Sequence, residues 1–316
     1  MRLAATSLLI LLLAACGDSA RDAAGERPPQ PGPKESAAVV EAPPAKLPAL
    51  KAVPETRVDE NGVRYSTIDG AQFVLVTGGT CRIGDDDGRY DERPAFPARL
   101  SPFLLDRAEV SNAQFERFVE ATGYKPAGPW RRGFGTGEGE LPVRFVSWHD
   151  AAEYAKWAKR RLPTEAEWEA AFGGKRYPWG DEWELGRAVT NRPVGQGPKP
   201  VSSGTDRAAC GAVNLGGNVR EWVADWYDRY AWAELAQADL AENPTGPPDG
   251  ALPEARFIDT ATVAGNERST RKVVRGAGWA SPGREFARRS RRGAHNPHQW
   301  FNDVGFRCAL SVEVEE

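Results

Sequence analysis

The sequence is poor in the residue types that most often carry catalysis or bind metals. Its 316 residues include one methionine, three histidines and four cysteines. The 41 basic and 44 acidic residues nearly cancel, and the formal net charge is −3. Because nucleic-acid binding draws on a clear excess of basic residues, no nucleic-acid partner is expected. Long apolar runs are also absent: the run over residues 3–15 is about half of the ~20 residues that span a bilayer.

The N-terminus has the pattern of a secretory signal. Arg2 supplies one positive charge before the apolar run, which ends in two alanines directly before Cys16. This end resembles a bacterial lipobox, in which the peptide is cut before the cysteine and the thiol is acylated. We therefore expect a signal peptide over 1–15 and a lipid on Cys16 that attaches the protein to the membrane. Glycine at position 17 favours an outer-membrane lipoprotein facing the periplasm or the cell surface. The alternative is an ordinary signal peptide with a chance cysteine.

Residues 16–56 are predicted to form a disordered tether. Eight prolines lie between Pro28 and Pro54, among alanines, glutamates and lysines without apolar periodicity. Such a segment buries too little apolar surface to offset the entropy lost on ordering, and its prolines favour extended geometry. The folded part is predicted over 57–316, a length that suits one large domain or two small ones.

A few helices and many short strands are predicted for the folded part. Helices are expected to begin after Ser111, Ser147 and Thr164, and Glu167 completes a capping box with Thr164. Gly173 and the next glycine are expected to end the third helix. The segment 233–270 is polar and is interpreted as an inserted loop. The fold class is therefore α+β and loop-rich, with strands expected at 72–76, 80–83, 272–275 and 304–308.

Eight segments, taken in order, resemble one family. They are 73–80, 109–115, 142–148, 161–169, 177–180, 214–222, 274–279 and 305–308. The series is similar to the formylglycine-generating enzyme (sulfatase-modifying factor) family and covers roughly residues 70–312. The resemblance implies a C-type-lectin-like fold in which N- and C-terminal strands meet in one sheet.

The family's catalytic site is not matched. Its oxidases bind copper through a cysteine pair, and soft thiolates suit Cu(I). Here Ser281 and Phe286 occupy the two cysteine positions, so copper is not expected and no catalytic residue is assigned. Three further pocket positions also depart from the family: its serine, tryptophan and asparagine are replaced by Gly278, Arg220 and Asp303.

The resemblance does imply a calcium site. In the family, one short run supplies two side chains and two backbone carbonyls, and calcium prefers several hard oxygen ligands. The matching residues are Asn214, Gly217, Val219 and Glu221. Calcium is therefore the expected cofactor. The alternative is that Asn214 and Glu221 only cap turns.

With Cys16 acylated, three cysteines remain, so at most one disulfide is expected inside the domain. The family's usual partner of its last cysteine lies in the second helix, where this chain has Ala155. By the resemblance, Cys308 therefore pairs with Cys81 or with Cys210, and both pairings stay open.

The ligand cleft of relatives is formed by a loop that is rich in arginine here. Guanidinium groups bind carboxylates and phosphates, which suggests an envelope protein or an anionic ligand as partner. The alternative is that these arginines pair with acidic residues of the domain. His295 and His298, with Asp303 nearby, could hold a metal or simply line the cleft. The candidate ligand-binding residues are Arg220, Ser281, Arg284, Glu285, Arg288, Arg289, His295, His298, Trp300 and Asp303, beside Arg291 and Arg292.

Two functions follow. The first is a non-catalytic, calcium-stabilised binding or scaffold module in the cell envelope, held there by the lipid. The second is a divergent periplasmic oxidoreductase of the same family, acting through a metal or resembling the oxidases of pyoverdine maturation. The first is favoured, because the copper-binding cysteines are missing and the domain follows a long tether.

Overall fold

The computed structural model describes residues 48–193, 195–247 and 271–315, all within one compact unit. Cys16, residues 16–47 of the predicted tether and residues 248–270 of the predicted inserted loop lie outside these residues. Within the described part of the chain, no helix combines the length and the apolar character needed to cross a bilayer.

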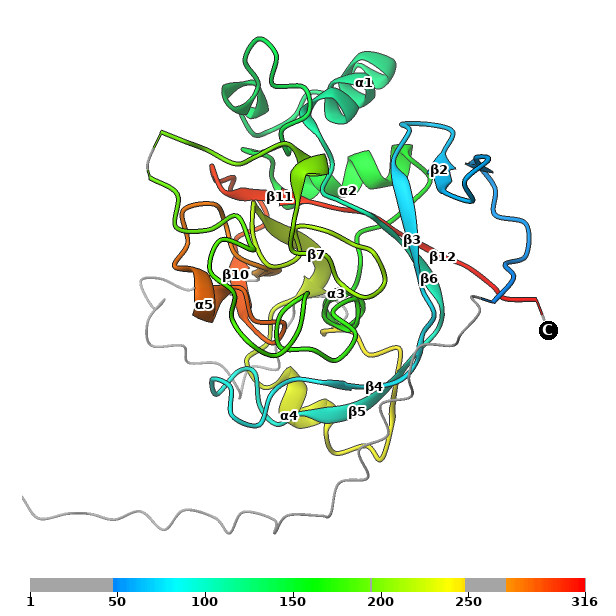
Figure 1. Cartoon of the computed structure of the whole chain (residues 1–316), viewed down its shortest axis with the longest axis vertical. Helices are drawn as coiled ribbons and strands as arrows, with labels where there is room; N and C mark the ends of the chain where they lie inside the picture. Colours follow the sequence, from blue (N-terminus) through cyan, green and yellow to red (C-terminus); the bar gives the residue numbers. More distant parts are fainter. Residues whose placement is uncertain (1–47, 194, 248–270, 316) are drawn as a thin grey trace, which may run out of the picture. The chain divides into compact units, whose positions relative to one another are not determined.

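An antiparallel sheet joins the two ends of the described chain. The C-terminal strand β12 pairs with β6, which also pairs with β3, so the expected meeting of early and late strands is confirmed (Figure 1). The strand predicted at 72–76 is confirmed as β3. In spatial order the five strands are β1 (Thr56–Val58), β2 (Arg64–Ser66), β3 (Gln72–Val76), β6 (Phe103–Asp106) and β12 (Ala309–Ser311).

Two smaller sheets complete the strand arrangement. In the first, β11 runs parallel to β7 while the other neighbours are antiparallel. Its order is β10 (Arg292–His295), β9 (Lys272–Arg275), β7 (Arg220–Trp226) and β11 (Val304–Phe306). The second contains β4 (Gly79–Ile83), β5 (Phe96–Leu100) and β8 (Ala241–Glu242).

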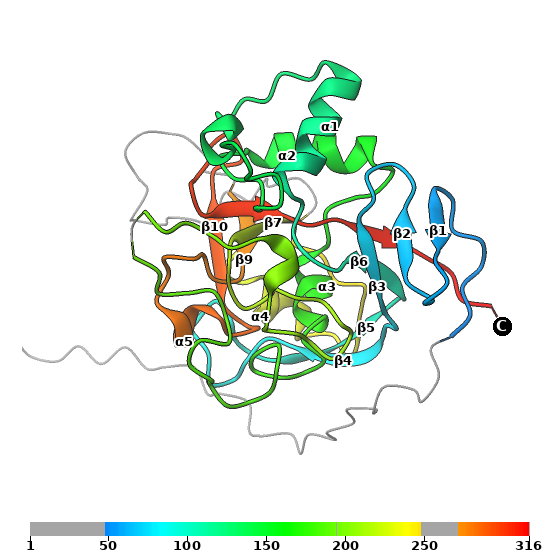
Figure 2. The same cartoon turned by 45° about the horizontal axis from the view of Figure 1, so that its top comes forward.

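The three predicted helices are present, each with the expected N-cap. α1 (Asn112–Thr122), α2 (Trp148–Trp157) and α3 (Glu165–Ala170) all begin with a capping box. α3 ends before the predicted stop at Gly173. Figure 2 shows α1 and α2 side by side, away from α4 (Ala231–Leu235) and α5 (Gly283–Phe286). Two short 3-10 helices, Trp130–Gly133 and Val201–Ser203, lie in the loops.

The folded part begins earlier than the sequence predicted. Leu50 pairs with Val314 in an isolated bridge, and Lys51 Nζ lies 2.7 Å from Glu313 Oε2. These contacts attach residues before position 57 to the C-terminal end of the domain. The last residues of the predicted tether therefore belong to the fold.

The three described cysteines are free, so the expected disulfide is a wrong prediction. Cys308 is buried in the core around α1 and α2, whereas Cys81 packs against the core beneath β4 and β5. Cys210 packs against a third core and donates to the carbonyl of Ala171 at 3.3 Å. Sulfurs in three different cores cannot approach the ~2 Å that a disulfide bond requires.

Candidate functional site

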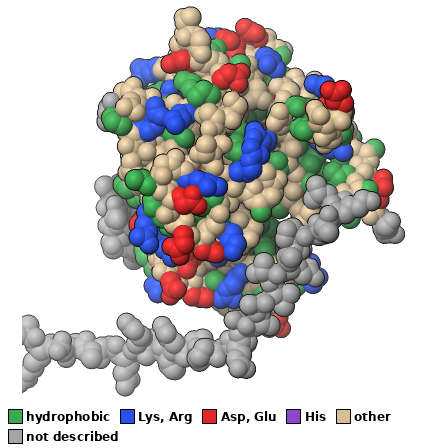
Figure 3. All heavy atoms as spheres, viewed as in Figure 1, with side chains coloured by type: hydrophobic (Ala, Val, Ile, Leu, Met, Phe, Trp, Pro, Cys, Tyr) green, Lys and Arg blue, Asp and Glu red, His purple; other side chains and the backbone are tan. Residues whose placement is uncertain are grey.

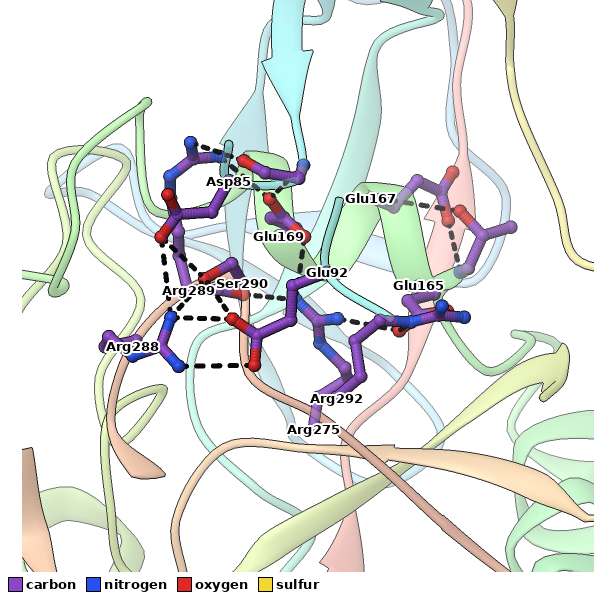
Figure 4. A network of polar contacts seen from close by, with 12 residues as sticks. Asp85, Glu92, Glu165, Glu167, Glu169, Arg275, Arg288, Arg289, Ser290 and Arg292 are labelled. Carbon is purple, nitrogen blue, oxygen red and sulfur yellow. Dashed lines mark hydrogen bonds and ion pairs between the residues drawn. The ribbon is translucent and has the colours of Figure 1, made fainter. Parts of the chain in front are cut away.

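Two of the candidate ligand-binding arginines are held inside the domain. Figure 4 shows Arg288 facing Glu92, with its Nη1 2.7 Å from Glu92 Oε2, and only 4% of Arg288 is exposed. Arg289 donates to Glu169 Oε1 at 2.8 Å and to two backbone carbonyls. Their guanidinium groups are therefore bonded to partners inside the domain. For both residues the alternative is the correct one: these arginines pair with acidic residues of the domain.

A second part of the same network lies deeper. Glu165, at the start of α3, accepts from Arg275 at 2.7 Å and from both Nε and Nη2 of Arg292 at 2.8 and 2.9 Å. Burial alone would raise the pKa of Glu165, but Arg292 and Arg275 bring it below its usual value. These arginines tie β9 and β10 to α3. Their guanidinium groups hold the ends of the loop between the two strands in place, and they are not available to bind a ligand.

The cleft positions that depart from the family come together around Arg220. Its Nε and Nη2 donate to Asp303 at 3.0 and 2.8 Å, and its Nη1 donates to His295 Nε2 at 2.7 Å. Burial and the Arg220 charge lower the pKa of His295 to about 4, so its ring is neutral at pH 7. Arg220 and Asp303 therefore form an ion pair, and the neutral imidazole of His295 accepts a further hydrogen bond from Arg220.

The remaining candidates in this region point elsewhere or outward. Ser281 accepts from the backbone N–H of Gly278 at 3.0 Å. Glu285 is exposed and accepts from Arg288 at 3.2 Å. Arg284 is exposed and makes no hydrogen bond or ion pair with any residue that the structure describes. Trp300 is 37% exposed, with its ring centroid 6.0 Å from that of Phe145.

The structure does not bring His295 and His298 together as one metal site. His295 is bonded to Arg220, whereas the exposed ring of His298 lies against His149, with ring centroids 4.6 Å apart. Within the described ranges, no group of three or more His, Cys, Asp or Glu side chains is arranged to hold a metal ion. His149 is not among the residues predicted from the sequence, because it lies on α2, far along the chain from His298.

The two positions that match the copper cysteines have different surroundings. Phe286 ends α5 and, like Trp179 and Trp183, packs against the buried cluster of Tyr177, Ala277 and Ala287. The Arg291 guanidinium lies 4.8 Å from the Phe286 ring centroid. Ser281 is engaged with the backbone of its own turn. An apolar ring in an aromatic cluster supplies no donor atom to a metal, so this set does not fit copper.

The predicted calcium residues gather in a buried acidic region. Glu221 accepts from Arg307 at 2.7 Å through both of its oxygens and from Trp168 at 2.9 Å. The Asn214 side chain donates to Glu109 at 2.8 Å. A calcium ion would therefore have to share Glu221 with Arg307 and turn the Asn214 amide, and calcium binding here stays a prediction.

The charge of this region nevertheless suits a cation. Asp206, Glu109 and Glu221 are all buried. Among the hydrogen bonds of the described residues, one basic side chain reaches this group: Arg307, which bonds to Glu221. Burial raises the pKa of Asp206 to about 6, and burial with the Glu221 charge raises that of Glu109 to about 8. Protonation of Glu109 and binding of a cation are two ways to relieve the same excess of negative charge.

Charged side chains of both signs alternate on the surface. Figure 3 shows Lys and Arg interspersed with Asp and Glu over the visible face, without an extended region of one sign. A ligand that binds this face would therefore meet local groups and not a large charged field.

Comparison with known proteins identifies similar chains and folds. A model of the "sulfatase-modifying factor enzyme 1-like domain" matches residues 61–312. A formylglycine-generating enzyme of Thermomonospora curvata is 36% identical over 241 residues, covering 56% of this chain and 78% of the relative. The mouse "inactive C-alpha-formylglycine-generating enzyme 2" is 31% identical over 299 residues, covering 76% and 86%. The structure of PvdO from Pseudomonas aeruginosa is similar with a TM-score of 0.59 at 23% identity, covering 77% of this chain and 95% of PvdO.

Proposed function

Because the chain belongs to the sulfatase-modifying factor family, we propose that it is a non-oxidising member that binds a partner in the cell envelope. The observation that carries this proposal is Phe286, which stands at one of the two copper-cysteine positions and packs against the buried cluster of Tyr177, Ala277 and Ala287. The free thiols of Cys81, Cys210 and Cys308 lie in three separate cores and cannot act as a replacement pair. A relative in the family that is itself named inactive supports this reading.

The proposed location is the outer membrane, and the proposed cofactor is calcium. A lipid on Cys16 would hold the protein at the outer membrane, facing the periplasm or the cell surface, with the tether giving the domain reach. Calcium at Asn214, Gly217, Val219 and Glu221 would steady the fold by supplying the positive charge that its acidic neighbours lack. The oxidoreductase alternative loses its metal pair, because His295 and His298 face different partners.

We expect the wild-type chain to bind no stoichiometric Cu(I) and to leave a cysteine-containing sulfatase peptide unchanged. The double variant Ser281→Cys/Phe286→Cys is expected to gain Cu(I) binding, since it restores two thiolates at the positions that the family uses. Competition with a chromophoric Cu(I) chelator and mass spectrometry of the peptide measure the two properties. Conversion of the peptide to formylglycine by the wild type would overturn the proposal.

The surface proposed for the partner is the exposed part of the cleft rim. Arg284, Glu285, His298 and Trp300 are the candidates that face solvent. Trp300 and Arg284 are the two chosen here, because exposed tryptophan and arginine most often dominate binding energy at interfaces. The Arg220–Asp303 pair is not offered to the partner, since its geometry is bidentate and already satisfied.

We expect Trp300→Ala to reduce recovery of the partner from envelope extracts at least tenfold, because losing one such anchor costs about 2 kcal/mol or more. Val58→Ala is the matched control, since Val58 is 51% exposed on β1 in a different sheet. Quantitative pull-down with the full chain measures both variants. Equal recovery with wild type and Trp300→Ala would remove the rim from the proposal.

A further inference from the structure

Two of the three histidines in the chain are brought into contact at the surface. His149 lies in the first turn of α2, and His298 lies in the loop between β10 and β11. Their ring centroids are 4.6 Å apart and their planes are tilted by 36°. Both residues are exposed, so neither ring is needed to fill the core.

The backbone fixes the positions from which the two rings extend. The N–H of Trp148 donates to the carbonyl of Pro297 at 3.1 Å, which joins the start of α2 to the histidine loop. Within the loop, the backbone N–H of His298 donates to Asn296 Oδ1 at 2.9 Å. The two imidazoles are therefore held near each other by the fold, although they are far apart in the sequence.

The separation of the rings agrees with two imidazoles on one metal ion. A Zn–N bond is about 2.0–2.1 Å, which places each ring centre roughly 3.2 Å from the metal. Two such rings at 90–110° around one ion have centres about 4.5–5.2 Å apart, by the same Zn–N length. The observed 4.6 Å lies inside this range.

The chemistry of the pair also favours a metal of this class. Imidazole nitrogen suits Zn²⁺ and Cu²⁺ and is a poor ligand for the hard ions Ca²⁺ and Mg²⁺. A ligating imidazole must be neutral, so binding at this pair would weaken as the pH falls and the rings take up protons. Since no third His, Cys, Asp or Glu joins the pair within the described residues, water would complete the coordination.

We infer that His149 and His298 form a surface site for a borderline divalent cation, Zn²⁺ or Cu²⁺, bound through two imidazole nitrogens and solvent. The site joins α2 to the loop that carries Trp300. It is separate from the predicted calcium residues and from the positions that match the copper cysteines, and it does not depend on the proposed binding function.

The test is a calorimetric titration of Zn²⁺ into the full chain, prepared without a polyhistidine tag. We expect the wild type to bind one zinc ion that His149→Gln and His298→Gln each weaken at least tenfold. His295→Gln is the matched control and should bind like wild type, because the His295 Nε2 already accepts from Arg220. Zinc bound by thiols is common to all four proteins and does not affect the comparison.

Three results would overturn the site: no histidine-dependent zinc binding at concentrations up to about 0.1 mM, equal affinity in wild type and His298→Gln, or equal loss in all three variants. Because both rings are exposed, the two site variants should unfold at the wild-type temperature without zinc. A zinc-induced rise in that temperature, present in the wild type and the control and missing in both site variants, is the second measurement.

Discussion

Glu165→Gln is expected to lower the free energy of unfolding by about 3–5 kcal/mol, the cost of breaking a buried ion pair by removing one partner. Glu165 is 1% exposed and accepts from both Arg275 and Arg292, which are themselves fully buried. A neutral amide leaves these two guanidiniums without their shared counter-charge. Glu169 would then be the remaining ion-pair partner of Arg275 among the described residues, and Glu169 already accepts a hydrogen bond from Arg289.

The measurement is thermal unfolding at pH 7, where a loss of this size corresponds to a fall in Tm of roughly 10 °C for a domain of this length. Glu184→Gln is the matched control: its pair with Arg187 is 2.8 Å long but half-exposed, so we expect a change within ~0.5 kcal/mol. If both variants shift Tm equally little, the network does not stabilise the fold.

The pH dependence supplies an independent check. The pKa of Glu165 is lower in the folded state than its usual value, so its contribution is complete above that usual value and is lost as the pH falls through the folded pKa. The difference between wild type and Glu165→Gln should therefore shrink in acid. A difference that stays constant to pH 3 would assign the effect to packing instead of charge.

What the sequence could predict follows from the range of each interaction. The capping box of Thr164 with Glu167 needs only residues three positions apart, and it is present as predicted. The Arg288–Glu92 pair joins residues 196 positions apart, and no local pattern in the sequence identifies which carboxylate an arginine will meet. Helix starts were therefore predictable, whereas the use of the arginines was not.

The cysteines and histidines show the same limit. The resemblance to the family indicated that strands near both ends share a sheet, but Cys81 lies on β4, which belongs to a different sheet from β12. The contact of His298 with His149, not with its sequence neighbour His295, arises because α2 packs against the histidine loop. Family resemblance predicted the framework and the missing copper ligands, while the internal ion pairs emerged only from the structure.

Arg160→Met is the second substitution for which we expect a large effect. Arg160 lies between Asp69 and Asp106, bonded to both, and all three side chains are almost fully buried. Asp69 also accepts from Tyr154, and Asp106 accepts from the backbone N–H of Cys308 at 2.9 Å. Removing the one guanidinium leaves two adjacent carboxylates without a counter-charge, and we expect a loss of about 3–5 kcal/mol at pH 8.

The loss should be smaller in acid, and its sign separates charge from packing. Even with Arg160 present, burial raises the pKa of Asp106 to about 6, so its protonated form is favoured below that pH. A carboxyl with a raised folded pKa contributes stability below its usual pKa and loses that contribution as the pH rises through the folded value. With Arg160 present the pKa of Asp69 is lowered and that of Asp106 is raised. Without Arg160 the pKa of both carboxyls shifts upward, so the variant should approach wild type near pH 4 and diverge from it by pH 8.

Urea unfolding of wild type and Arg160→Met at pH 4, 6 and 8 measures this divergence. The triple variant Arg160→Met/Asp69→Asn/Asp106→Asn is the control, because it removes both carboxylates with the arginine while keeping their shapes. We expect it to regain part of the stability at pH 8 and to show little pH dependence over this range, since an apolar or neutral replacement of a buried ion pair is often tolerated. An Arg160→Met deficit that is the same at pH 4 and pH 8 would contradict the electrostatic explanation and assign the cost to the cavity left by the side chain.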